Sequence, residues 1–141
     1  MTLTQILKML VACILIITFI LVTASAYQQH RTISALAKLT DATSSIVTKL
    51  AVDELAHVDG TGNKSSYVLD PNKLENLAFR REVGGENFEF QISLWYQGRE
   101  NSTFGPTPPE NRTNCSLIVA CSLWFNNRFQ LAKFGVIAWR A

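Results

Sequence analysis

A long uncharged stretch near the N-terminus, Met9–Gln29, constrains this chain more than any other feature. Its centre, Met9–Val22, is almost entirely apolar, and water penalises such a surface heavily whereas a bilayer does not. A helix needs about 20 mostly apolar residues to cross a membrane. Ile6–Ala26 supplies that length, interrupted only by Lys8, whose long side chain can reach the lipid–water interface. The sequence therefore predicts that this segment meets a membrane.

The same stretch also has the three parts of a secretory signal peptide. Lys8 is a basic start, the apolar core runs to Val22, and Ala24-Ser25-Ala26 is a small-x-small exit. The residues that follow favour a retained anchor, because Tyr27–Ala56 contains neither Pro nor Gly. We expect a single-pass membrane protein, and secretion after cleavage at Ala26 is the alternative.

The segment behind the apolar stretch has helical periodicity. Polar and charged side chains cover much of its surface, and apolar residues recur at spacings of three and four, namely Ile33, Leu36, Leu39, Ile46, Val47, Leu50 and Leu55. The pattern predicts one long helix, roughly 50 residues, that is apolar all round in its first half and amphipathic in its second.

The period changes to two in the last third of the chain. Phe88, Phe90, Ile92 and Leu94 alternate with mostly polar residues, which predicts a strand with one buried face. Ser116–Phe125 is a second strand, apolar on both faces and so expected to be well covered, and Phe129–Trp139 is a third. Asn126-Asn127 forms the turn between them because Asn tolerates positive φ. Val68-Leu69 is a candidate edge strand.

A short helix is predicted between these parts. Asp70 is a favourable N-cap, Pro71 suits the first helical position, and Leu74 and Leu77 lie on one face of a helix that ends near Phe79. The expected fold is α+β, a long helix packed on a small antiparallel β-sheet. We expect a membrane anchor or signal-like segment (1–29), an amphipathic helical stalk (30–59) and an extracytoplasmic β-rich head (60–141).

Charge argues against one function class, and length limits the number of domains. The net charge of +2 in 141 residues is small, and the basic residues form no stripe, which argues against nucleic-acid binding. About 110 residues remain after the apolar entry, enough for one modest domain.

Three cysteines are present. Cys13 lies in the apolar stretch, where it acts as a small hydrophobe. Cys115 and Cys121 are the only plausible pair, but six residues apart on one straight strand they would lie about 20 Å apart, too far for a disulfide. A bridge requires the chain to bend between them, or Cys115 to lie in the preceding loop.

Four sequons for N-glycosylation follow the predicted helix, at Asn63, Asn101, Asn111 and Asn114. They indicate an exported, glycosylated domain, although a loop rich in Ser, Thr and Asn would give the same pattern by chance. The C-terminal domain is therefore expected outside the cytoplasm.

No residue pattern predicts catalysis, a cofactor or a metal site. Asp53, Glu54 and His57 share a predicted helical face, but a metal site of this kind needs a matching motif on another helix, and none exists. We interpret these residues as polar side chains that keep the end of the helix in contact with water. Trp95, Trp124 and Trp139 are read as core or interface residues, with a carbohydrate-binding stack as the alternative.

The layout resembles the type IV pilin superfamily, in particular the small pilin-like and archaellin-like membrane proteins of archaea. The carrying segments are Met9–Ala26, Val68–Leu74, Ser116–Phe125 and Phe134–Trp139. Two positions differ from the family pattern: Lys8-Met9 stands where a basic and a small residue precede the apolar run, and no acid occurs before Asp41. These differences fit an unprocessed, membrane-bound relative.

The resemblance implies a structural or accessory subunit of a surface filament or envelope assembly, without catalysis. Its partners would be membrane lipid and other pilin-like subunits, including copies of itself, and no small-molecule substrate is evident. Val11, Ile14, Ile17 and Leu21 form one stripe for packing between helices or in lipid. The alternative is a tethered or secreted binding module for an envelope component or a glycan.

Overall fold

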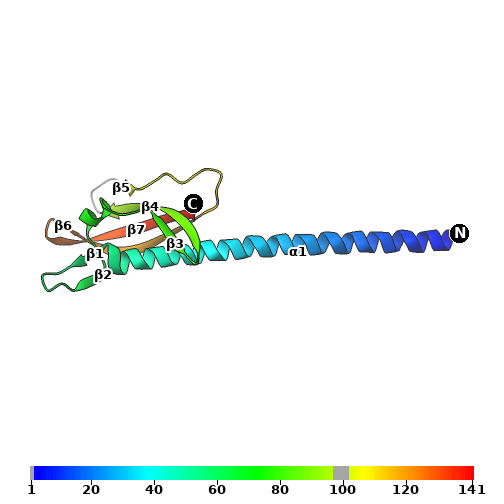
Figure 1. The fold of residues 1–141 in the computed structure, drawn as a ribbon, viewed down its shortest axis with the longest axis horizontal. Helices are drawn as coiled ribbons and strands as arrows, with labels where there is room; N and C mark the ends of the chain where they lie inside the picture. The colour runs from blue at the N-terminus through cyan, green and yellow to red at the C-terminus, as the bar shows by residue number, and fades with distance from the viewer. Residues whose placement is uncertain (1, 97–101) are drawn as a thin grey trace. The chain divides into compact units, whose positions relative to one another are not determined.

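The computed structural model describes residues 2–96 and 102–141 (Figure 1). The chain divides after Ala37, and the two parts are described separately. The first is helical throughout. The second, Lys38–Ala141, is called the folded unit below, and it begins inside the long helix, so the last turns of that helix belong to it.

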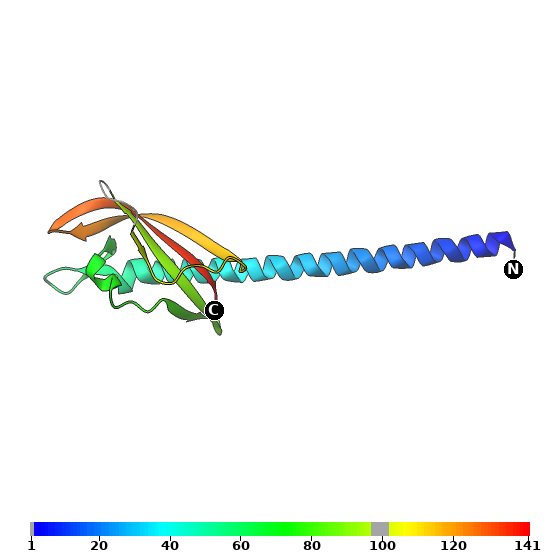
Figure 2. The ribbon, with the colours of Figure 1, turned by 90° about the horizontal axis from the view of Figure 1, so that it is seen from above.

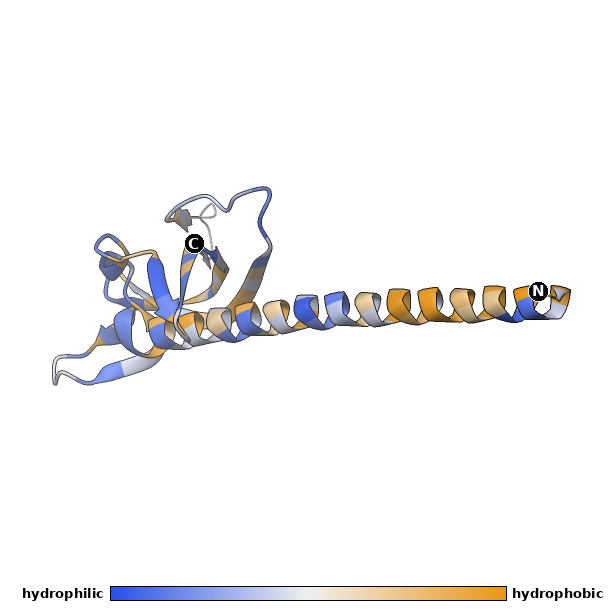
Figure 3. Cartoon of the chain, turned by 45° about the vertical axis from the view of Figure 1, so that its right-hand side comes forward, coloured by the Kyte–Doolittle hydropathy of each residue, from blue (hydrophilic) through white to orange (hydrophobic). Residues whose placement is uncertain are grey.

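Helix α1 spans Leu3–Lys49 and continues into a π-helical turn, Leu50–Glu54. The turn closes where the Leu55 amide donates to the Leu50 carbonyl at 2.9 Å. One long helix is therefore confirmed, because neither Pro nor Gly interrupts the backbone hydrogen bonds. Figure 3 shows the apolar colouring concentrated in the N-terminal turns of α1.

Seven strands form one sheet in the order β1-β2-β6-β7-β4-β3, with β5 paired to β4. Within the described residues the strands are β1 (Ala56–Val58), β2 (Lys64–Leu69), β3 (Arg80–Val83), β4 (Glu86–Tyr96), β5 (Ser102–Phe104), β6 (Asn114–Phe125) and β7 (Arg128–Arg140). The predicted α+β class is confirmed, and the three long predicted strands correspond to β4, β6 and β7.

The sheet is mixed, which corrects the expected purely antiparallel arrangement. Val68 and Leu69 of β2 pair in parallel with Ser122 and Leu123 of β6, and the other pairs are antiparallel. A parallel pair needs a long crossover between its strands. The chain from β2 to β6 supplies one, because β3, β4 and β5 lie within it.

The part of α1 that belongs to the folded unit, from Lys38 on, packs against one face of the sheet. Its buried side chains are spaced by three or four residues and form one core with the alternating residues of β4 and β7: Leu39, Ala42, Ile46, Val47, Leu50, Phe88, Phe90, Ile92, Leu94, Phe134, Val136 and Ala138. The Thr43 hydroxyl is buried in this face but donates to the Leu39 carbonyl at 2.7 Å. The predicted positions Ile33 and Leu36, by contrast, are exposed.

The turns follow the predicted chemistry only in part. Asn126 and Asn127 have φ of 51° and 57°, as a two-residue hairpin turn requires. The Asp70 carboxylate caps a helix by accepting from the Asn72 amide at 3.1 Å, as predicted. That helix is a short 3-10 turn, Pro71–Leu74, and does not reach Phe79.

Candidate functional site

The four predicted stripe residues Val11, Ile14, Ile17 and Leu21 all lie on α1 and are exposed. So are the other large apolar side chains of this part of the helix, on every side of it. The described residues contain one helix, Leu3–Glu54, that is long and apolar enough to cross a membrane, and a signal sequence has the same properties. Burial of this surface therefore requires lipid or another chain.

The few polar side chains in this apolar run make hydrogen bonds within the helix itself. The Thr18 hydroxyl donates to the Ile14 carbonyl and the Thr23 hydroxyl to the Phe19 carbonyl, each at 2.8 Å. An unsatisfied hydroxyl in hydrocarbon costs several kcal/mol, roughly as much as any buried polar group. These two bonds make the segment compatible with a dry environment.

The predicted sequons lie at the surface where the structure describes them. Asn63, Asn111 and Asn114 are exposed, and Asn101 lies outside the described residues. Exposure makes these asparagines accessible to modification, and their use stays a prediction.

The possible disulfide between Cys115 and Cys121 is not formed within the chain. Both residues lie on β6, which is unbroken between them, and both thiols are free. Six residues of one strand separate their Cα atoms by about 20 Å, whereas a bridge needs about 4.4–6.8 Å. Both side chains lie on the sheet face that packs against α1, where Cys115 approaches the Thr40 hydroxyl at 3.9 Å.

The acidic residues at the helix end serve the fold. Asp53 pairs with Lys64 of β2 and Glu54 with Arg81 of β3. The hydrogen bond from the Lys64 ammonium, with its charge, lowers the pKa of Asp53 below the ordinary 3.8. These pairs fasten the π-helical turn to the sheet.

His57 lies in β1 and not on the helix, because α1 and its π-helical turn have ended by then. Its ring stacks on Trp124 at 4.6 Å, and its Nδ1 atom is buried with no hydrogen-bond partner in the described structure. Residues 2–96 and 102–141 hold no group of three His, Cys, Asp or Glu side chains that could bind a metal ion.

The three tryptophans do not form a common ligand surface. Trp139 is fully buried, with its Nε1 donating to the Glu89 carboxylate at 3.2 Å. Trp124 contacts two aromatic rings, stacked on His57 and tilted against Phe129, with ring centroids 4.6 Å apart in each pair. The alternative interpretation, a carbohydrate-binding stack of the three tryptophans, is therefore wrong.

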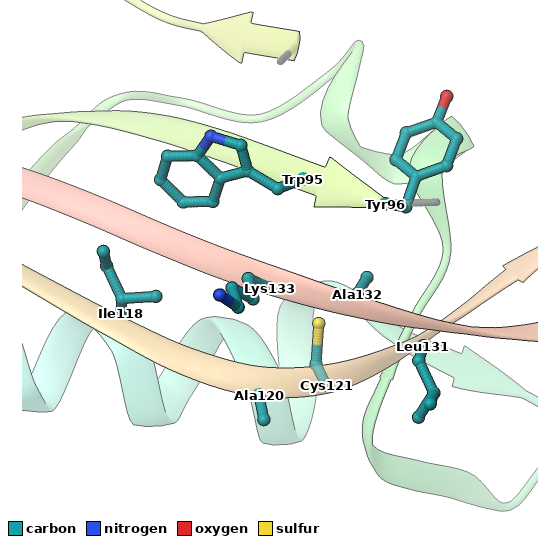
Figure 4. A pocket seen from close by; sticks show the side chains of 8 residues that line it. All are labelled: Trp95, Tyr96, Ile118, Ala120, Cys121, Leu131, Ala132 and Lys133. Atoms are coloured by element: carbon teal, nitrogen blue, oxygen red, sulfur yellow. The ribbon is translucent and has the colours of Figure 1, made fainter. Parts of the chain in front are cut away.

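Trp95 instead borders an open, mostly apolar hollow of about 590 Å³ on β4, β7 and β6 (Figure 4). It is lined by Trp95, Tyr96, Ile118, Ala120, Cys121, Leu131, Ala132 and Lys133. The Trp95 ring lies over Gly135 so closely that a Cβ there would be 2.7 Å from it. The absence of a side chain at Gly135 therefore lets the indole pack directly on the backbone of β7, a role that no local sequence signal reveals.

Strand β6 is less covered than its apolar sequence predicts. Its first seven residues, Asn114–Ala120, are exposed or half-buried, and Leu117 and Ile118 are exposed on opposite faces. The sequence pattern did indicate apolar faces, but it could not show that nothing in the described structure covers them.

Comparison with known protein families, with curated proteins and with solved structures returned no match. The pilin resemblance thus stays a prediction from layout.

Proposed function

We propose that this protein is a membrane-anchored, extracytoplasmic, pilin-like structural or accessory subunit of a surface filament or envelope assembly. One observation carries the proposal: the apolar side chains of α1 up to Val22 are exposed all round the helix. Such a surface is stable only in lipid or against other apolar helices.

Two further features support an exported subunit. The hydroxyls of Thr18 and Thr23 are satisfied within the helix, as a dry environment requires. The three described sequon asparagines are exposed.

A charge in the middle of the apolar run tests the anchor. Ile17→Asp should abolish recovery in the membrane or filament fraction, because an Asp at the centre of a spanning helix costs about 3 kcal/mol on insertion scales. Thr48→Asp is the matched control, since Thr48 is an exposed residue of α1 in the folded unit. Undiminished pelleting of the Ile17→Asp protein with membranes would refute the proposal.

Two measurements then separate the alternatives. The intact mass shows whether the N-terminus is retained, and a mature chain starting at Tyr27 would contradict the anchor. Electron microscopy with an antibody against residues 60–141 shows where the protein resides. Labelled filaments or envelope support a structural subunit, and secreted monomer argues against it.

The hollow beside Trp95 favours a second candidate, a tethered or secreted binding module for an envelope component or glycan. An open apolar hollow with an aromatic wall and one cation, Lys133, is typical of a ligand site. Trp95→Ala should then lower binding of the purified protein to envelope fragments at least tenfold, with exposed Phe129→Ala as control. Equal binding by both variants would contradict this function.

A further inference from the structure

Strand β6 has one edge that is open over most of its length. Its opposite edge pairs with β7 from Asn114 to Phe125, but β2 pairs with the open edge only at Ser122 and Leu123. Between Asn114 and Cys121 no strand of the described structure pairs with this edge (Figure 2). The outer edge of β4, by contrast, is covered by β3 and by β5.

This edge has none of the usual protection against pairing with another chain. Exposed edge strands normally carry a charge, a proline or a bulge. Asn114–Cys121 contains no charged residue and no proline, and its register with β7 is regular. Leu117 is 37% exposed and Ile118 56% exposed, on opposite faces. A free backbone edge flanked by apolar side chains is what strand addition by a partner requires.

We propose that this edge binds the same segment of a second copy, antiparallel, around a two-fold axis at Ile118. A two-fold interface must be self-complementary, and this segment is. Ile118 would face Ile118 of the second copy, Leu117 would face Val119, and Ser116 would face Ala120. No like charges meet. The pairing spans Cys115–Cys121 and stops where β2 already occupies the edge, at Ser122.

The two cysteines provide an independent indication of this register. They lie three residues before and three residues after Ile118, so the pairing places Cys115 of each copy opposite Cys121 of the other. Opposite residues of antiparallel strands have Cα atoms about 4.5–5.5 Å apart, within the range that a disulfide needs. The thiols that are too distant to bridge within one chain would thus be neighbours between two chains.

This interface lies in the folded unit and goes beyond the proposed function, because it holds whether or not the N-terminal segment is retained. The test therefore uses the full chain in detergent and removes the third thiol, with Cys13→Ala as background. A separate variant that keeps only Cys13 reports contact between N-terminal helices. Its result bears on the proposed function alone.

Oxidation with diamide, which takes two electrons and two protons from each thiol pair, should give covalent dimers of the Cys13→Ala protein on non-reducing gels. Adding Cys115→Ala, or adding Cys121→Ala, should reduce the dimer at least tenfold. Mixing these two variants before oxidation should restore it, since one copy supplies Cys115 and the other Cys121. Efficient cross-linking of either variant alone, or no dimer from the two-cysteine protein, would overturn the proposed pairing.

Charged substitutions at Ile118, on the two-fold axis, test the same interface without covalent cross-linking. Ile118→Lys and Ile118→Glu should each be monomeric by light scattering, because each places like charges opposite one another, whereas their mixture should dimerise. Leu131→Lys is the control, since Leu131 is 86% exposed but lies on β7, outside the open edge of β6, where it pairs with Ser122. Loss of the dimer in the control as well, or no recovery in the mixture, would contradict the proposal.

Discussion

Burial raises the pKa of the Cys121 thiol to about 11, because the apolar surroundings disfavour the thiolate. At pH 8 only about one thiol in a thousand would then be ionised, and the thiolate is the reactive form. We expect iodoacetamide to modify Cys121 at least tenfold more slowly than the half-exposed Cys115 in dilute, reduced protein. Peptide mass spectrometry gives both rates, and the difference should vanish in urea. Equal rates in the folded protein would show that Cys121 is accessible.

Asp53 is a single residue with a predictable response to acid. Its pKa is lowered in the folded protein by the Lys64 ammonium, so its ion pair contributes stability above the pKa of the unfolded state. That contribution is lost as the pH falls through the lower, folded value, below the ordinary 3.8. The pair is exposed, so the effect is small.

Urea unfolding midpoints at pH 6 and pH 3 measure this effect. Asp53→Asn should lessen the fall in the midpoint between the two pH values, and Lys64→Gln should do the same. The double variant should add nothing further, because either change alone removes the pair. An unchanged pH dependence in both single variants would mean that the pair does not form in solution.

Among the elements, β4 and β7 are fitted to one another by the contact of Trp95 with Gly135. Gly135→Ala places a methyl group within 2.7 Å of the indole, and overpacking of this kind costs about 1–3 kcal/mol. In a Trp95→Ala background the same change should be neutral or stabilising, because Ala suits a strand better than Gly. Chemical denaturation of the four proteins gives the coupling energy, and purely additive effects would refute the contact.

The long strands and the helix could be predicted from the sequence because each has a strong, local hydrophobic period. The buried residues of β4, such as Phe88 and Ile92, follow that period closely. The short strands β1, β3 and β5 could not, since three or four residues give too little pattern. Their pairing depends on partners that are distant in the sequence.

The candidate sites were predictable to different degrees. The apolar run of α1 is a property of composition, so it could be recognised in the sequence, whereas the structure exposes apolar side chains on every side of it and singles out no stripe. The free edge of β6 and the contact of Trp95 with Gly135 arise from topology, because both depend on which strands lie next to one another. The same reason explains why the disulfide was left open: only the unbroken course of β6 shows that Cys115 and Cys121 are far apart.

At the scale of the whole molecule, the folded unit depends on residues of the long helix. Ile46 is fully enclosed by the core, so Ile46→Ala should lower the free energy of unfolding by about 2–5 kcal/mol. Ile33→Ala is the matched control, since Ile33 is 65% exposed and its truncation should change little. Denaturation of both proteins in detergent tests this, and equal losses would place the helix outside the core.

The central position of β7 has a consequence for the order of assembly. It follows β4 and β6 along the sequence, yet it lies between them and pairs with both. Until Arg128–Arg140 has left the ribosome, β4 and β6 lack the strand that pairs with both of them. The strand edges that face β7 then stay unpaired, and the apolar side chains beside them stay exposed. The sheet thus forms only after β7 has been synthesised, and a chain stalled before Arg128 would be prone to aggregation and an early substrate for proteolysis.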